Sequence, residues 1–239
     1  MEENQILDGQ SIVGSESSDL ARQFTAHVFS WMVAGLALTA VVSWYFASSG
    51  LITSLFSETG RTPLGWVVML APLGFILVMN FGFERFSAIG LSIVFLLFSA
   101  TMGASLSYIF FVYSMTAIIK VFAITSGTFA IMAAVGYTTK TDLTKFGSIL
   151  MMGLVGIILA SLVNMFLGSA RIDYIISIIG VLIFTGLIAY DTQKIKAMGM
   201  QVGLGSQQSR KLALMGATSL YLDFINLFLF LLRILGRRD

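Results

Sequence analysis

Residues 220–233 read LYLDFINLFLFLLR, an apolar run that contains one aspartate, Asp223, and no basic residue before Arg233. A carboxylate at the depth of a bilayer costs about 2.5–3.5 kcal/mol on insertion scales, so its side chain should face a bundle interior or a water-filled cavity. Steps of three and four residues place small and polar side chains on one stripe: Gly216, Ser219, Asp223, Asn226, Phe230 and Arg233. The stripe predicts a helix that packs against protein on this face.

The composition of the chain indicates an integral membrane protein. Of the 239 residues, 57% are hydrophobic and 11% are charged, and the mean hydropathy is +0.91. This small number of charged residues cannot cover the surface of a water-soluble protein of 239 residues. We therefore expect the lipid bilayer to cover most of the protein surface. The net charge of +2 is small and the basic residues are scattered, so we expect no nucleic-acid partner. The absence of cysteine excludes disulfides, thiolate nucleophiles and cysteine-ligated metals.

Apolar windows of about 20 residues predict the membrane-spanning helices. Between Arg85 and Lys140 the only charge is Lys120, and this stretch is too long for one helix, so we divide it at residues 111–117. The predicted spans are 24–47, 64–83, 86–109, 118–139, 146–167, 174–190 and 212–232. The predicted fold class is therefore all-α, with a single seven-helix transmembrane domain over residues 23–239 and a flexible acidic tail over residues 1–22.

The distribution of Lys and Arg predicts the orientation of these spans. The N-terminal tail and the connections on its side hold eight basic residues: Arg22, Arg85, Lys140, Lys145, Lys194, Lys196, Arg210 and Lys211. The opposite connections hold three, Arg61, Lys120 and Arg171, so we expect a cytoplasmic N-terminus. Arg233, Arg237 and Arg238 oppose this assignment if the seventh segment crosses fully, and a re-entrant seventh segment is the alternative.

A second acidic residue, Asp191, ends the sixth predicted span in the stretch AYDTQKIK. One interpretation is an interfacial acid at a helix end, three residues before Lys194. The other interpretation is a carboxylate pair, because spans six and seven are consecutive, can pack antiparallel and would bring Asp191 close to Asp223. Two carboxylates a few ångströms apart cannot both ionise cheaply, so such a pair titrates as a unit and can sense protons near neutral pH. It is also part of a site for a hard cation such as Ca²⁺, with Asn226 and backbone carbonyls as supplements.

Two other charged or titratable residues require an interpretation. Arg85, after the second span, is the nearest candidate counter-charge for the aspartates, and the alternative is a solvated loop residue that follows the positive-inside rule. His27, the only histidine, fits an interfacial polar residue better than a metal ligand. We expect no cofactor, apart from calcium as a permeant or bound ion.

Four stretches together resemble the Bax inhibitor family of small membrane proteins: MGASLS (102–107), GYTTKTDLTKFG (136–147), AYDTQKIK (189–196) and LYLDFINLFLFLLRILG (220–236). The resemblance extends from Arg22 to Arg238 and is to a bacterial member. It implies a multi-pass protein of the bacterial inner membrane, with seven helices and the last helix in the middle. It also implies a pH-sensitive calcium leak governed by two aspartates, matched here by Asp191 and Asp223. An arginine from helix two, best matched by Arg85, would pair with the first aspartate in the closed state.

The sequence leaves more than one function to weigh. The resemblance favours a pH-gated cation leak, whose ligands are calcium and protons. The alternative is an interaction protein that binds or restrains other membrane proteins such as a protease, which uncharged helix faces rich in small residues would allow. Paired aspartates also occur in aspartyl proteases, but Asp223 lies in YLDFIN, without the GxGD turn of the intramembrane enzymes, so we do not expect an enzyme.

Overall fold

The computed structural model describes residues 2–57, 60–202 and 205–236, with side chains from Ser17 onward. Its helices are α1 (Glu2–Ser48), α2 (Pro63–Phe81), α3 (Ala88–Leu106), the short α4 (Ile109–Val112), α5 (Met115–Thr138), α6 (Thr144–Leu167), α7 (Ala170–Gln201) and α8 (Gln207–Leu235). A 3₁₀ turn (Leu51–Ser54) and a small antiparallel hairpin, β1 (Phe56–Ser57) and β2 (Gly60–Arg61), join α1 to α2. Within the described residues, seven helical segments are long and apolar enough to cross a membrane. The prediction of an all-α, seven-span protein is confirmed.

Local sequence signals explain where several of these helices begin. Five starts have a Ser or Thr whose side chain accepts a hydrogen bond from the backbone N–H three residues later: Thr62, Ser87, Ser114, Ser169 and Ser206. Such caps satisfy an N–H group that has no partner inside the helix. The cap at Ser114 lies inside the predicted division at 111–117, because the chain leaves helical geometry at Tyr113 before α5 begins.

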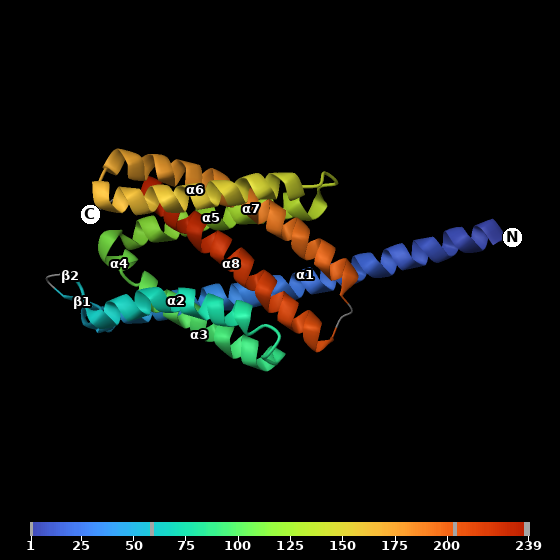
Figure 1. Cartoon of the computed structure of the whole chain (residues 1–239), viewed down its shortest axis with the longest axis horizontal. Coiled ribbons are helices and arrows are strands. Elements are labelled where there is room, and N and C mark those ends of the chain that lie inside the picture. Colours follow the sequence, from blue (N-terminus) through green and yellow to red (C-terminus); the bar gives the residue numbers. More distant parts are fainter. Residues whose placement is uncertain (1, 58–59, 203–204, 237–239) are drawn as a thin grey trace.

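The first helix is longer than its predicted span. The residues expected to form a flexible tail continue α1 as a helix that projects beyond the bundle (Figure 1). The flexibility of this segment stays a prediction. At the other end of the chain, Arg237 and Arg238, which complicated the topology, lie outside the described residues.

The helices do not pack equally (Figure 1). Helix α7 packs against α1, α5, α6 and α8, and α8 packs against α1, α3, α5 and α7. Helix α2 packs on α3, and α6 packs on α7 alone among the long helices. The predicted central position of the last helix stays a prediction, but α8 crosses between α1 and α5 as one uninterrupted helix of 29 residues.

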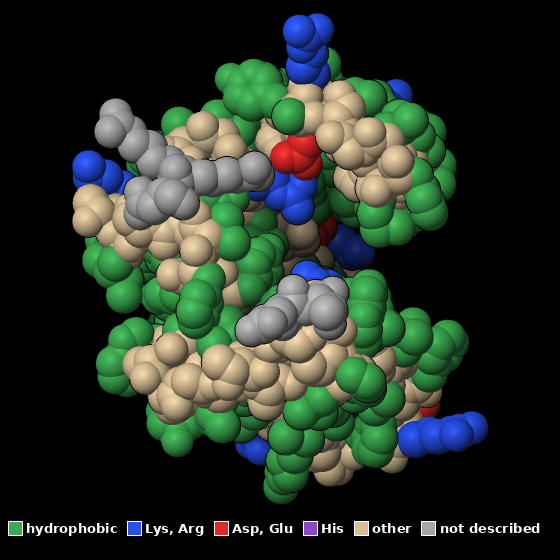
Figure 2. All heavy atoms as spheres, turned by 90° about the vertical axis from the view of Figure 1, so that its left-hand side faces the viewer, with side chains coloured by type: hydrophobic (Ala, Val, Ile, Leu, Met, Phe, Trp, Pro, Cys, Tyr) green, Lys and Arg blue, Asp and Glu red, His purple; other side chains and the backbone are tan. Residues whose placement is uncertain are grey.

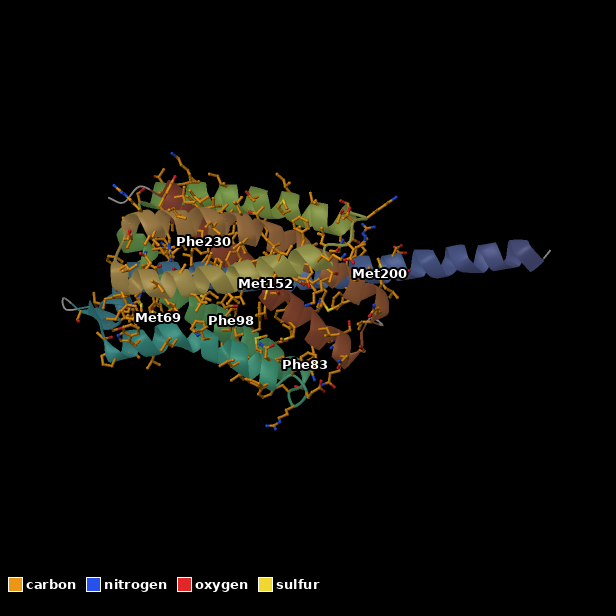
Figure 3. The ribbon with its side chains drawn as sticks, turned by 45° about the horizontal axis from the view of Figure 1, so that its top comes forward. Met69, Phe83, Phe98, Met152, Met200 and Phe230 are labelled. Carbon is orange, nitrogen blue, oxygen red and sulfur yellow. The ribbon has the colours of Figure 1, made fainter. Side chains whose placement is uncertain are left out.

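A chain of hydroxyl groups joins three helices in the interior. The Thr39 hydroxyl on α1 donates to the Ser99 carbonyl on α3 (2.8 Å), so the Tyr221 phenol on α8 donates to Thr39 (2.6 Å). Tyr221 is fully buried, and its ring meets Phe98 edge to face, with ring centroids 5.0 Å apart. Phe98 lies inside the bundle, whereas Met69 and Phe83 mark opposite ends of the α2 region (Figure 3). The network satisfies polar groups that would otherwise be costly in a lipid environment.

Two of the stretches that carry the family resemblance contact each other. The Gln193 amide on α7 accepts from the Leu143 N–H (2.8 Å) and donates to the Thr141 carbonyl (2.8 Å), which fixes the connection between α5 and α6. Lys196 donates to the Tyr137 carbonyl at 2.7 Å. The residues of GYTTKTDLTKFG are therefore held by those of AYDTQKIK.

The opposite end of the bundle carries a second polar cluster. Figure 2 looks onto this end and shows acidic and basic side chains meeting in a hollow surrounded by hydrophobic ones. Here Arg233 of α8 forms an ion pair with Asp173 of α7 (3.4 Å), and both side chains are 38% exposed. Arg61 of the hairpin lies over the rings of Phe56 and Trp66.

Substitution of Gly136 should test the close packing of α5 on α7. A Cβ at this position would overlap the backbone carbonyl of Ala189, and backbone cannot move aside as a flexible side chain can. We expect Gly136→Ala to destabilise the protein by about 1–3 kcal/mol, the usual cost of overpacking. Thermal unfolding of the purified protein in detergent measures this effect.

The control is Gly127→Ala on the same helix, where an added Cβ meets no atom within 4 Å. This change should be neutral or stabilising by up to about 1 kcal/mol, because alanine is the better helix former. Equal melting temperatures for the two variants would contradict the predicted contact.

Candidate functional site

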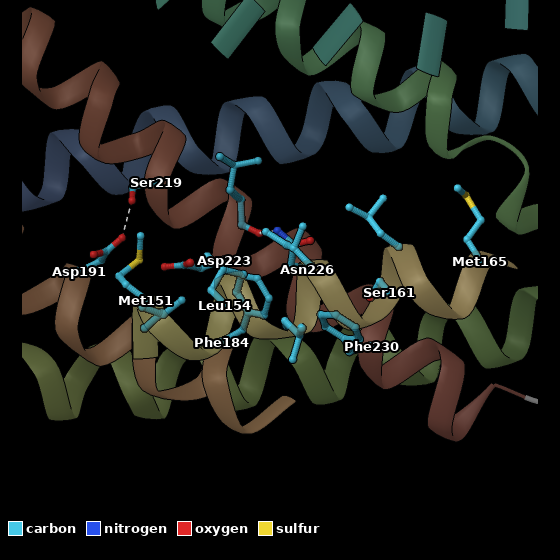
Figure 4. Close-up of a pocket in the computed structure, with 15 residues that line it drawn as sticks. Met151, Leu154, Ser161, Met165, Phe184, Asp191, Ser219, Asp223, Asn226 and Phe230 are labelled. Atoms are coloured by element: carbon cyan, nitrogen blue, oxygen red, sulfur yellow. Dashed lines mark hydrogen bonds between the residues drawn. The ribbon is translucent and has the colours of Figure 1, made fainter. Parts of the chain in front are cut away.

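The most prominent cavity lies between α6, α7 and α8 and has a volume of about 600 Å³ (Figure 4). Both predicted aspartates line it, together with Ser219 and Asn226. Apart from Ser161, the remaining lining residues are apolar: Met151, Leu154, Ile157, Ile158, Leu162, Met165, Phe184, Leu187, Leu222 and Phe230. A few convergent polar groups in an apolar cavity are typical of a functional site.

Asp191 and Asp223 are brought together by the antiparallel packing of α7 and α8. The connection between these helices is residues 202–206, shorter than the sequence predicted, because both helices extend beyond their apolar runs. The two carboxyl groups come within hydrogen-bonding reach of each other. Asp223 is only 5% exposed, and its Oδ2 atom receives no hydrogen bond from any described residue. A hydrogen bond between the two acids requires that one of them carries a proton.

Asp191 is held by a partner of its own. The Ser219 hydroxyl, one turn before Asp223 on α8, donates to Asp191 Oδ2 (Figure 4). Asp191 does not end its helix, since α7 continues to Gln201. Asp191 therefore does not lie at a helix end as one interpretation expected, because the polar sequence TQKIKAMGMQ remains helical, whereas its position relative to the membrane interface stays a prediction.

The polar stripe predicted on the last helix faces this cavity. Ser219, Asp223, Asn226 and Phe230 all line it. Asn226 donates its amide N–H to the Leu222 carbonyl (2.8 Å), so its amide oxygen is available to the cavity. Two carboxylates, one amide oxygen and one hydroxyl are hard oxygen donors of the kind that Ca²⁺ prefers.

The described part of the chain contains no group of three or more acidic, histidine or cysteine side chains that could hold a metal ion. Calcium takes six to eight oxygen ligands at equilibrium, so waters or backbone carbonyls would have to complete its shell here. The donor set therefore fits a weakly held, exchanging cation better than a tightly bound one.

Arg85 lies apart from the two aspartates. It is exposed in the turn between α2 and α3, it does not line the cavity, and α2 does not pack against α7. The described side chains include no ion-pair partner for Arg85. In this conformation the structure supports the alternative interpretation of Arg85 as a loop residue.

Phe184 and Phe230 line the cavity, and charged side chains lie beside Phe230 at the end of the bundle that Figure 2 displays. The ring of Phe230 packs against Phe184, with centroids 5.8 Å apart, and Arg233 lies over the Phe230 ring at 5.4 Å. The ion pair of Arg233 with Asp173 then joins α8 to α7 beside this ring. Asp191 and Phe230 lie toward opposite ends of the cavity (Figure 4).

Comparison with known proteins agrees with the geometry and the motifs. The family model described as "Inhibitor of apoptosis-promoting Bax1" matches residues 21–239. The chain belongs to the Bax inhibitor family. Inner membrane protein YbhL of Escherichia coli is 44% identical over 216 residues, which cover 90% of this chain and 92% of that protein. An uncharacterized membrane protein of Streptococcus pyogenes is 36% identical over 235 residues, which cover 95% and 98%.

One wall of the cavity in this Bax inhibitor family member was not predicted. Helix α6 supplies seven of the lining residues, including Met151 and Met165. These two methionines are 50% and 69% exposed, so they form the rim of the cavity. The high hydropathy of α6 gave no signal for this role, because a cavity wall and a lipid-facing surface are both apolar.

Replacing Asp223 should stabilise the fold. A buried carboxylate with an oxygen that lacks a donor carries a desolvation penalty of a few kcal/mol. We expect Asp223→Asn to raise the melting temperature at pH 8, because the amide keeps the volume and removes the charge. Asp19→Asn, at an exposed position on α1, should leave it unchanged. If Asp223→Asn lowers the melting temperature and Asp19→Asn does not, the Asp223 carboxylate is stabilised by an interaction that is not among these contacts.

Proposed function

We propose that this protein is a pH-sensitive calcium leak of the bacterial inner membrane in which Asp191 and Asp223 form the proton-responsive site. The observation that carries the proposal is the pair of carboxyl groups, in reach of each other and lining one cavity within a membrane-spanning bundle. Intramembrane acids are costly and mark ion or proton pathways in many membrane proteins. Membership of the family is compatible with the same function.

Protons and calcium would compete for the same oxygen atoms. When the pair shares a proton, the two acids attract each other and hold α7 against α8. When both are ionised, they repel each other and attract a divalent cation into the cavity. The balance between these states would change with pH as one coupled titration of the two groups.

The incomplete ligand set suits passage of the ion. Conduction requires binding that is favourable enough for entry and weak enough for release. Two carboxylates with Asn226 and Ser219 as supplements leave most of the calcium shell to water. Phe230 and the Asp173–Arg233 ion pair would have to move for an ion to leave the cavity at the end where Phe230 lies.

Calcium flux into proteoliposomes that contain only this protein tests the proposal. Flux of the wild type should change across a pH series that spans neutral pH, because the two carboxyl groups exchange their proton as one coupled unit. Asp223→Asn and Asp191→Asn should each flatten or shift this dependence, because the remaining acid no longer titrates as half of a pair. The double variant should add little to the larger single effect, since the two residues act as a unit.

The matched control is Asp19→Asn, an exposed acid outside the cavity, which should keep the wild-type profile. The same pH profile in the wild type and all three cavity variants would remove the carboxylate pair from the mechanism. A protein that conducts no calcium at any pH would remove the leak itself.

A role for Arg85 in a closed state requires a different arrangement of α2 and α7. If Arg85 pairs with Asp191 in that state, Arg85→Gln should raise the flux under closed conditions severalfold and leave open-state flux unchanged. Arg171→Gln, an exposed arginine at the start of α7, is the control for lost charge. Identical flux in both variants and the wild type would assign Arg85 to the loop alone.

A further inference from the structure

A long apolar groove runs between α1 and α5, separate from the aspartate cavity. Both helices pack against α7 and α8, yet their backbones hardly contact each other, so a gap remains between them on either side of one aromatic contact. Two hollows of about 560 and 380 Å³ follow this gap and share Phe29 and Phe129 as lining residues. Alanines make up much of the walls, and the rings of Phe29 and Phe129 meet edge to face across the groove with centroids 6.3 Å apart.

The groove contains a buried hydroxyl group that has no partner. Most buried Ser and Thr hydroxyls of the helices bond a backbone carbonyl, as the Thr125 hydroxyl does on α5 with the Val121 carbonyl (2.8 Å), and among the described residues Ser43, outside the groove, is a second one without a partner. Thr25 is an exception. Its side chain is 3% exposed and lines the groove, but its hydroxyl forms no hydrogen bond with any described residue. Buried polar groups are nearly always satisfied, so Thr25 indicates a missing ligand atom.

One basic side chain lines the end of the groove where Thr25 lies, and a second lies beside a lining residue. Arg22 lines the groove one helical turn before Thr25, on the same face of α1. On the far side, Lys196 lies over the ring of Tyr137, another lining residue, at 4.7 Å. The nearest acids along the chain, Asp19 and Asp142, are exposed and do not line the groove.

We propose that the groove between α1 and α5 binds an anionic phospholipid, with its phosphate at Arg22, a polar headgroup or ester atom at the Thr25 hydroxyl and one acyl chain along the alanine walls. The lining of the two hollows runs along α1 from Arg22 to Ala40, roughly 27 Å at about 1.5 Å per residue, which is close to a hydrocarbon core about 30 Å thick, so the acyl chain occupies the part of the groove nearest Arg22. Basic pockets between helices are known to hold anionic headgroups. Under the predicted orientation, the lipid belongs to the cytoplasmic leaflet.

The chemistry of the groove favours a lipid over a second copy of the chain. A phospholipid joins an anion to an apolar chain in one molecule, which matches a basic mouth and an alanine-lined body. A helix from another copy would have to present an acid at the depth of Arg22 and small residues along the rest of its face. The open lipid-facing side also lets an acyl chain enter from the bilayer without any movement of the helices.

Lipid retention by the purified full-length protein tests this proposal. The protein is incubated with equal amounts of phosphatidylglycerol and phosphatidylcholine, and bound lipid is counted by native mass spectrometry. We expect phosphatidylglycerol to be retained preferentially. Arg22→Gln should lower that preference about fivefold, which corresponds to about 1 kcal/mol for one basic residue near an anionic lipid. Arg171→Gln removes the same charge elsewhere and should have no effect.

A second set of variants separates the acyl chain from the headgroup. Ala134→Leu fills the groove at an exposed lining position and should lower retention of both lipids, whereas Ala123→Leu, exposed on the same helix outside the groove, should not. Thr25→Val should lower phosphatidylglycerol retention without lowering the melting temperature, because its hydroxyl has no protein partner.

Three results would overturn the proposal. The first is equal retention of the two lipids, and the second is equal loss with Arg22→Gln and Arg171→Gln. The third uses the absence of native cysteine: if Ala130→Cys, at a lining position of the groove, forms a disulfide-linked dimer readily in membranes, the groove is an interface between two copies. None of these results depends on calcium flux.

Discussion

Asp223 is buried in an apolar helix with one carboxylate oxygen that receives no hydrogen bond, and much of the bundle is arranged around that fact. A bilayer offers no water at this depth, so the acid needs either a proton or a cation, and both must reach it through protein. Asp191, Ser219 and Asn226 are the polar side chains of α7 and α8 that line the same cavity. As a purely structural element, this site would lower the stability of the fold. A functional reason for its presence is therefore favoured.

The other helices meet the constraint that polar groups in lipid must be satisfied within the protein. Thr39 and Tyr221 form a buried hydrogen bond that ties α1 to α8, and Gln193 fixes the connection of α5 to α6 by both ends of its amide. Gly136 lets α5 approach the backbone of α7. These contacts fix α8 against α1 and α7 against α5, and α7 and α8 carry the two aspartates.

The sequence predicted the spans and the aspartate pair because both depend on strong, local signals. Hydropathy over about 20 residues identifies a span, and a carboxylate within an apolar run marks a position that lipid cannot accept.

The sequence did not predict the length of α7 or the role of α6. Residues 191–201 are polar enough to resemble a loop, but tertiary contacts such as that of Lys196 with Tyr137 keep them helical. Met151 and Met165 have the same hydropathy whether they face lipid or a cavity, so only the packing of α6 on α7 could reveal them. The position of Arg85 depends on the turn after α2, which apolar patterns do not specify.

The unequal packing of the helices has a consequence for biogenesis. Helices α1 and α5 hardly contact each other and gain most of their shared interior from α7 and α8, which leave the ribosome last. The first five spans therefore enter the membrane as an incomplete bundle. Their small-residue faces and buried hydroxyl groups do not yet have the side chains of α7 and α8 to pack against. The final hairpin then arrives with both acids already facing each other, so each can shield its partner while the pair crosses the hydrocarbon. Assembly would then insert the two intramembrane acids last.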